Sequence, residues 1–461
     1  MNSFWDYSIW STILLISVLL GGLLVGNILK KGIPILRNSL IPTSVLGGTV
    51  LIIVAAIYKW STGNVMFDTK IFGGNGTATL EMITYHALAL GFIASTLKTS
   101  DNKLSKQRTK EIFNTGVTTV STYLLQAVVG IAITIVAAMV ISGFFKAAGI
   151  LLPFGYGQGT GQALNYGNIY ETENGFDGGK SFGLTIAALG FLSASFGGVI
   201  HLNIMKKRGT LKLSNAKNEL NNEIIESENE IPMQESVDKL TIQVALIFMA
   251  YVLTYVFMLL LGKALPGMKS TIYGFNFLLG VLSATLIKVI MKFFKKISTQ
   301  KKDYTNNFLL TRTSNFFFDI MVVAGIAAIR LDALQKYWGI MLILGVAGLV
   351  ITYVYNRIVA KTLFKDYAEE QFLAMYGMLT GTASTGIILL REIDGDFKTP
   401  AADNLVYQNF PAIVFGFPIM LIATFAPGHE LLTLGILVAF FVVMNIILFR
   451  EQIFKRKKKN K

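Results

Sequence analysis

Eleven apolar stretches, each about 20 residues long, constrain the fold of this chain more than any other feature. A stretch of that length can cross a bilayer core as a helix, and a helix satisfies all of its own backbone hydrogen bonds. Hydrophobic residues make up 53% of the 461 residues and charged ones only 15%, against about 25% charged in soluble domains. We therefore expect an all-α polytopic membrane protein. The stretches run approximately over Ile9–Leu29, Leu40–Tyr58, Leu80–Leu97, Gly116–Ile141, Phe182–Met205, Leu240–Leu261, Thr271–Phe294, Phe308–Ile329, Trp338–Leu363, Leu405–Phe425 and Leu431–Phe449.

The distribution of basic residues predicts the orientation. Basic residues accumulate in short cytoplasmic loops. Placing the N-terminus outside and the C-terminus in the cytoplasm assigns most of the 41 Lys and Arg residues to cytoplasmic segments. The net charge of +14 is then explained by topology, and we expect no nucleic-acid partner. The first stretch lacks a basic leader and a small-residue cleavage site, so we interpret it as a retained helix.

Two glycine-rich segments are too polar for lipid-facing helices and too apolar for aqueous loops. They run from Phe144 to about Glu171 and from about Tyr367 to Asp394. Both contain the pattern Tyr-Gly-x-x-Thr-Gly-[Gln/Thr]-Ala, which starts at Tyr156 in the first and 220 residues later in the second. Irregular backbone is tolerated at membrane depth only where protein buries it or where it lines a cavity. We interpret the segments as re-entrant, and the shared pattern as the trace of a duplication.

This duplication predicts an inverted repeat. Each half has five spans with a re-entrant segment between the fourth and fifth, and an odd number of spans inverts the second half. Inverted repeats with broken helices near the midplane are typical of secondary transporters. The predicted units are residues 1–205 for the first repeat, 206–239 for a cytoplasmic linker, 240–427 for the second repeat, and 428–461 for an extra C-terminal span and basic tail.

The tips of the re-entrant segments are the predicted binding site. Free N–H groups at half-helix starts can hold a carboxylate, and exposed carbonyls can hold Na⁺. The alternative for these small residues is close helix packing. Arg391 could bind a carboxylate through its guanidinium fork, or could be neutralised by Glu392 and Asp394. The candidate substrate-binding residues are Gln158, Gly159, Thr160, Gly161, Gln162, Thr380, Gly381, Thr382, Ser384, Thr385 and Arg391, with sodium expected at the same tips.

Polar residues inside the later spans are candidates for ion coupling, because an ionisable group inside a membrane helix is costly. The candidates are Asn315, Asp319, Gln408 and Asn409. Asp319 is either a cation or proton site or a buried partner of Arg312 or of a neighbouring backbone. The two amides near Pro411 either line a cavity or form hydrogen bonds between helices. The three His residues lack metal-ligand spacing, and there is no Cys, so we expect neither an enzyme nor a cofactor.

Two short motifs carry a resemblance to a known family. Ile41-Pro42-x-x-Val45-x-Gly47-Gly48 and Gln158-Gly159-Thr160-Gly161 resemble the IPxxVxGG and HGTG elements of the bacterial glutamate:sodium symporters. The chain departs from that family in Gln158 for His, in its second tip, in its long linker and in its eleventh span.

The resemblance implies a sodium-coupled importer of L-glutamate or a similar acidic solute, in the inner (cytoplasmic) membrane. It also implies a homodimer and an elevator mechanism related to that of the citrate:sodium symporters. Two alternatives stay open: a proton- or sodium-coupled carrier of another carboxylate, such as citrate or another dicarboxylate, and a channel or membrane-embedded sensor.

Overall fold

The computed structural model describes residues 4–38, 40–98, 105–209, 237–297, 302–335, 337–394 and 398–455. Ten helices in these ranges are long and apolar enough to cross a membrane, and a bent helix pair makes an eleventh candidate span. The prediction of an all-α polytopic membrane protein is confirmed. Most of the predicted linker, residues 210–236, lies outside the described ranges.

The candidate spans follow the predicted order. They are α1 (Tyr7–Gly32), α3 (Thr43–Thr62), α4 (Gly76–Leu97), α5 (Lys106–Val140), α8 (Gly179–Lys207), α10 (Lys239–Ala264), α12 (Asn276–Ile297), α13 (Asn307–Ala327), α14 (Trp338–Leu363), α18 (Asn409–Phe425) and α19 (Glu430–Leu448). The shorter helices are α2 (Pro34–Asn38), α6 (Leu151–Tyr156), α7 (Thr160–Asn174), α11 (Lys269–Gly274), α15 (Ala368–Thr380), α16 (Ala383–Arg391), α17 (Ala401–Tyr407) and α20 (Arg450–Lys455).

Three spans differ from the predicted ones. The first four residues predicted for the seventh span, 271–274, belong to the separate helix α11. Helix α5 begins at Lys106 rather than Gly116, so the polar residues before the apolar stretch are helical as well. The Ser105 side chain stabilises this start by accepting a hydrogen bond from the backbone N–H of Arg108. The tenth span is not one straight helix: α17 and the part of α18 from Pro411 onward meet at 51°. A proline at 411 cannot donate a backbone hydrogen bond to the carbonyl of Tyr407, which weakens the helix at this point.

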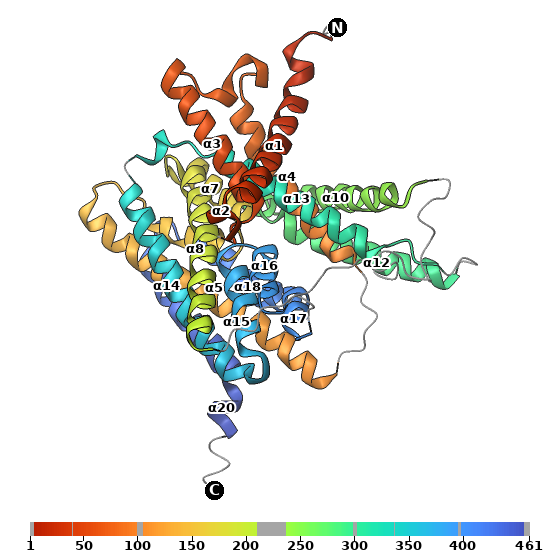
Figure 1. The fold of residues 1–461 in the computed structure, drawn as a ribbon, viewed down its shortest axis with the longest axis vertical. Helices are drawn as coiled ribbons and strands as arrows, with labels where there is room; N and C mark the ends of the chain where they lie inside the picture. Colours follow the sequence, from red (N-terminus) through yellow and green to blue (C-terminus); the bar gives the residue numbers. More distant parts are fainter. Residues whose placement is uncertain are drawn as a thin grey trace.

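Six spans form one group, which we call the arm bundle: α1, α3, α4, α10, α12 and α13. Helices α4 and α13 pack along each other at its centre. Helix α3 packs on α13, and α12 packs on α4. The pairs α1–α3 and α10–α12 extend from this centre as two arms (Figure 1).

Helices α5–α8 and α14–α19 form a second group, which we call the hairpin bundle. It contains both predicted re-entrant segments as helical hairpins, α6–α7 and α15–α16. Just before the first hairpin, the backbone of Gly149 packs directly against the backbone of Gly130 in α5. A methyl group added to either glycine would lie about 2 Å from the carbonyl oxygen of the other. Only glycine permits so close an approach.

The ion pairs agree with the predicted alternation of sides. Lys59 pairs with Asp332 at 3.0 Å, and both residues lie in segments predicted to be outside. Lys110 pairs with Glu451 at 2.6 Å, and both lie in segments predicted to be cytoplasmic. Which of the two sides faces the cytoplasm stays a prediction.

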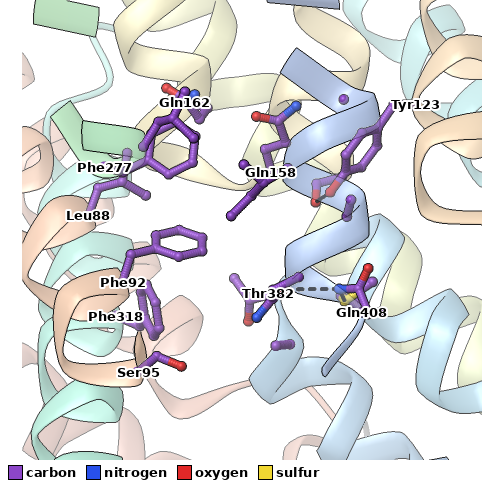
Figure 2. A pocket seen from close by; sticks show the side chains of 18 of the residues that line it. Leu88, Phe92, Ser95, Tyr123, Gln158, Gln162, Phe277, Phe318, Thr382 and Gln408 are labelled. Atoms are coloured by element: carbon purple, nitrogen blue, oxygen red, sulfur yellow. Dashed lines mark hydrogen bonds between the residues drawn. The ribbon is translucent and has the colours of Figure 1, made fainter. Parts of the chain in front are cut away.

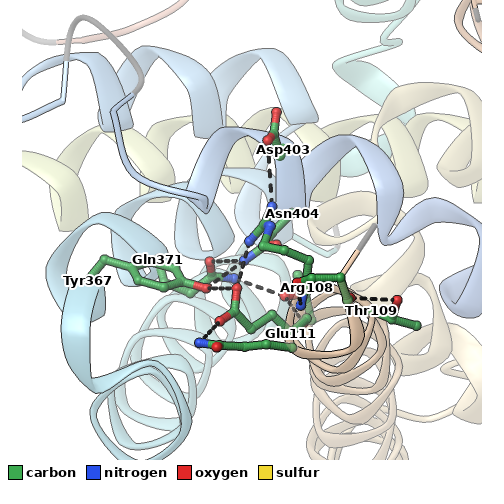
Figure 3. A network of polar contacts seen from close by, with 10 residues as sticks. Arg108, Thr109, Glu111, Tyr367, Gln371, Asp403 and Asn404 are labelled. Carbon is green, nitrogen blue, oxygen red and sulfur yellow. Dashed lines mark hydrogen bonds and ion pairs between the residues drawn. The ribbon is translucent and has the colours of Figure 1, made fainter. Parts of the chain in front are cut away.

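A polar network fixes the base of the second hairpin (Figure 3). Glu111 of α5 accepts hydrogen bonds from Arg108 at 2.6 Å and from the Tyr367 hydroxyl at 2.9 Å. Asn404 of α17 donates to the Tyr367 hydroxyl at 3.1 Å and to Gln371 of α15 at 3.0 Å. Burial, together with the neighbouring Glu111 carboxylate, raises the pKa of Tyr367. The hairpin base is therefore tied to α5 and α17 through hydrogen-bonded side chains.

Candidate functional site

The tips of the two helical hairpins, which the sequence predicts to be re-entrant, lie against each other. Gly159, at the tip of the first hairpin, has φ +83° and ψ −173°, a backbone region that is essentially restricted to glycine. A methyl group placed on its Cα would lie 3.5 Å from Cγ2 of Thr382 and 3.7 Å from the carbonyl oxygen of Gly381. Segments more than 200 residues apart in the chain therefore meet at one point, inside the hairpin bundle.

A cavity of about 150 Å³ adjoins the tips, and residues of both bundles line it (Figure 2). An apolar cavity of that size holds a molecule as large as benzene, so a small solute fits. Its polar lining comes from the hairpin bundle, except for Ser95 of α4: Tyr123, Gln158, Gln162, Thr382, Gln408 and Asn409. The arm bundle supplies an otherwise apolar wall: Leu88, Phe92, Phe277, Leu278, Phe318 and Met321.

Gln162 lines the cavity, and its amide nitrogen is buried with no hydrogen-bond partner among the described residues. Its side chain is 1% exposed, and its Oε1 accepts a hydrogen bond from Asn165 at 2.8 Å. Its Nε2 has no partner among the described residues. The same holds for the buried Thr160 hydroxyl, one residue beyond the tip. An unpaired buried polar group is costly, so a ligand that accepts the Gln162 N–H would be stabilised here.

Three helices begin at the cavity. The residues just before or at the starts of α7, α16 and α18 line it: Gln158, Thr382, Ala383, Gln408 and Asn409. Helix N-termini carry partial positive charge and free N–H groups, which bind anions. No Lys, Arg, His, Asp or Glu is among the lining residues of this part of the structure. Among the lining residues, the hydrogen-bond donors are therefore backbone N–H groups and neutral side-chain amides and hydroxyls.

The other predicted tip residues lie close behind the lining. Gly161 packs against Leu88 of α4, and Thr380 is buried with its hydroxyl donating to the Tyr376 carbonyl at 2.6 Å. The hydroxyls of Thr382 and Thr385 are 3.3 Å apart. The side chain of Ser384 lies outside the described part of the structure. Arg391 is exposed at the far end of α16 and does not line the cavity.

The four ion-coupling candidates separate into two pairs. Gln408 and Asn409 line the cavity at the α17–α18 break, where Gln408 accepts from Thr119 at 2.9 Å and donates to Asn409 at 2.9 Å. Asn315 and Asp319 are instead exposed on α13 and are absent from the lining. The Asp319 carboxylate is hydrogen-bonded by Ser44 in the first turn of α3.

Sequence reasoning missed the aromatic wall. Phe92, Phe277 and Phe318 face the hairpin tips from three helices of the arm bundle. Tyr123 of α5 donates its hydroxyl to the Gly157 carbonyl at 3.0 Å, which holds the first tip. No signal in the sequence marked the phenylalanines, because cavity-facing and lipid-facing aromatic residues look alike within an apolar span.

A charged cluster lies at the base of the second hairpin, away from the cavity. Glu369 pairs with Arg357 through both carboxylate oxygens and with His201 at 2.7 Å. Burial alone would raise the pKa of Glu369, but the hydrogen bonds from His201 and Arg357 outweigh it and lower this pKa to about 2. Within the described ranges, no three His, Cys, Asp or Glu side chains are placed to hold a metal ion. Cation ligands at the tips would therefore be neutral oxygens.

No protein-family model matches this chain, and no curated protein sequence is significantly similar to it. The resemblance to glutamate:sodium symporters therefore stays a prediction that rests on the two short motifs.

Proposed function

We propose that this protein is a sodium-coupled secondary transporter that imports glutamate or a similar small acidic solute. The observation that carries the proposal is the uncharged cavity where both re-entrant tips meet three helix N-termini and the unpaired Gln162 Nε2. A carboxylate would accept N–H groups from those helix starts and from Gln162. The backbone carbonyls near the tips, such as that of Gly381, supply oxygen ligands of the kind that Na⁺ prefers.

The division of the lining between the bundles favours an elevator mechanism. All polar lining groups except Ser95 belong to the hairpin bundle, so a solute bound there would travel with that bundle. The facing wall of the arm bundle is mostly phenylalanine, leucine and methionine, which offer few hydrogen bonds that would have to break during sliding. The arm bundle would be the fixed scaffold, and a homodimer would form through it.

The reciprocal packing of helices supports an inverted repeat. If α1, α3, α4 and α5 correspond to α10, α12, α13 and α14, then the contact of α3 with α13 corresponds to that of α12 with α4. The contact of α5 with α18 likewise corresponds to that of α14 with α8. We include the inverted repeat, with the N-terminus outside, in the proposal.

A second candidate substrate class is a monocarboxylate with an apolar body. The cavity lacks any basic side chain for a second carboxylate, and four of its lining residues are phenylalanines: Phe92, Phe277, Phe318 and Phe417. Such a solute would place its carboxylate at the helix starts and its apolar part against the aromatic wall.

Thermal unfolding of purified protein separates these candidates. L-Glutamate, citrate and phenylacetate would each be titrated in sodium and in potassium buffer. A ligand at about 100 times its Kd stabilises the folded state by about 2.7 kcal/mol, which is measurable. We expect sodium-dependent stabilisation by L-glutamate. Stabilisation by phenylacetate alone would assign the second class, and no stabilisation by any of the three would contradict both.

The variant Gln162→Met tests the cavity itself. It removes one charge-assisted hydrogen bond of about 1.5–3 kcal/mol, so the Kd should rise about 10- to 150-fold. The matched control is Gln107→Met, which changes an exposed glutamine in the first turn of α5. An unchanged Kd in the folded Gln162→Met protein would place the binding site elsewhere.

A further inference from the structure

The middle of the hairpin bundle contains a polar crossing outside the cavity, where α5 passes α14. Gln126 of α5 donates through Nε2 to the Thr352 hydroxyl at 2.8 Å. Asn356 of α14 donates through Nδ2 to the Thr122 hydroxyl at 3.4 Å. All four side chains are at most 1% exposed. We call these four residues the crossing cluster.

The crossing cluster is reciprocal. On each helix a threonine is followed four residues later by an amide: Thr122 and Gln126 on α5, and Thr352 and Asn356 on α14. The amide of each helix contacts the threonine of the other. The two halves of the cluster are 230 residues apart, ten more than the two tip patterns, so the reciprocity is a property of this helix contact.

Both amides leave their oxygen without a donor. Gln126 Oε1 and Asn356 Oδ1 have no hydrogen-bond partner among the described residues. Their orientations are fixed, since Gln126 Nε2 also donates to the Leu379 carbonyl at 2.9 Å and Asn356 Nδ2 to the Thr352 carbonyl at 2.9 Å. A carbonyl can only accept, so turning either amide around would place oxygen against oxygen.

Two buried amide oxygens that accept no hydrogen bond, on side chains whose nitrogens contact two threonine hydroxyls, are ligands of the kind that a hard cation takes. The crossing cluster contains no carboxylate, so its ligands are neutral and a monovalent ion is easier to accommodate than a divalent one. We propose that the crossing cluster is a sodium site, with Gln126 Oε1 and Asn356 Oδ1 as ligands and the hydroxyls of Thr122 and Thr352 completing the shell. This deepens the proposed function and rests on it, because it locates a coupling ion.

The position of the site gives it a route to the cavity. Gln126 bonds the carbonyl of Leu379, and Leu379 is followed by Thr380, Gly381 and Thr382 at the second tip. Gly381 and Thr382 line the cavity and meet Gly159 of the first tip. A cation bound by Gln126 Oε1 would therefore be joined to the second tip through the hydrogen bond from Gln126 to the Leu379 carbonyl.

Binding of radioactive sodium to purified protein, without any solute, tests the site. The wild type should bind sodium saturably, and Gln126→Met and Asn356→Leu should each weaken binding tenfold or more, since each removes one oxygen ligand. Thr122→Val is the milder third variant, for use if the amide variants do not fold. The control is Gln243→Met, because Gln243 is equally buried in the arm bundle and all of its polar atoms are paired.

The possible results separate this proposal from the proposed function. Sodium binding that weakens in the crossing variants and persists in Gln243→Met supports the site. Unchanged sodium affinity in the folded crossing variants would overturn it, would assign the two oxygens to a buried water, and would leave sodium-driven uptake untouched. No saturable sodium binding by the wild type would overturn the site as well, and solute uptake would then decide the function separately.

Discussion

The substitution Gly159→Ala isolates the backbone conformation of the first tip. The new methyl group would lie 3.5 Å from Thr382 and 3.7 Å from the Gly381 carbonyl, which are ordinary contacts, so it adds no steric clash. The whole effect comes from φ +83° with ψ −173°, where a residue other than glycine is disfavoured by about 1–3 kcal/mol. The chain can avoid this strain by moving the tip while the helices stay folded.

The expected result is therefore a loss of affinity with little loss of folded protein. Strain of about 1–3 kcal/mol at the binding tip corresponds to an increase in Kd of about 5- to 150-fold. The assay is solute titration followed by thermal unfolding, together with size-exclusion chromatography to show that the protein is folded. Gly435→Ala is the control, because a methyl group there meets nothing within 4 Å and no residue of α19 lines the cavity. A Gly159→Ala protein with wild-type affinity would refute the assignment of this tip to the binding site.

Three further predictions concern stability and coupling. Glu369→Gln should lower the free energy of unfolding by about 1–2 kcal/mol at neutral pH, a value reduced for solvent screening because the carboxylate is 32% exposed beside Arg357. The pKa of Glu369 is about 2 in the folded protein and 4.5 ordinarily, so the stability difference between variant and wild type should vanish as the pH falls from 4.5 to about 2. Denaturant titrations at a series of pH values measure this difference. Gly149→Ala should abolish folded protein in size-exclusion chromatography, since its methyl group would overlap the backbone of Gly130, and a normal monodisperse peak would contradict that packing. Asp319→Asn should retain sodium-dependent uptake, because this carboxylate lies outside the cavity lining, whereas loss of uptake with folding intact would favour proton coupling through it.

Much of the helix order could be predicted because the bilayer imposes it. Each span must be long and apolar, and each connection must place its charges in water. The positions of the spans, and the alternation of their connections between the two sides of the membrane, can therefore be predicted from the sequence. The bend before α18 was not predicted, although Pro411 marked it. The start of α5 at Lys106 was not predicted, because polar residues next to an apolar span can either continue the helix outside the bilayer or end it.

The candidate site was predictable only in part. The shared glycine-threonine pattern identified both tips, and polar residues in an apolar span identified Gln408 and Asn409. The same criterion also selects Gln126 and Asn356, but single amides in long apolar spans are equally common as helix contacts, so it does not distinguish a binding role from packing. The phenylalanine wall depends on which side of each helix faces the other bundle. That is a property of tertiary packing, and no local pattern encodes it.

Uptake into proteoliposomes tests the central claim most directly. Radiolabelled L-glutamate would be followed with an inward sodium gradient, with equal sodium on both sides, and with a sodium ionophore. The proposed function predicts accumulation above the external concentration only while the gradient exists, competed by unlabelled glutamate. Equilibration without accumulation would indicate a channel, and accumulation driven by a pH gradient in sodium-free buffer would contradict sodium coupling.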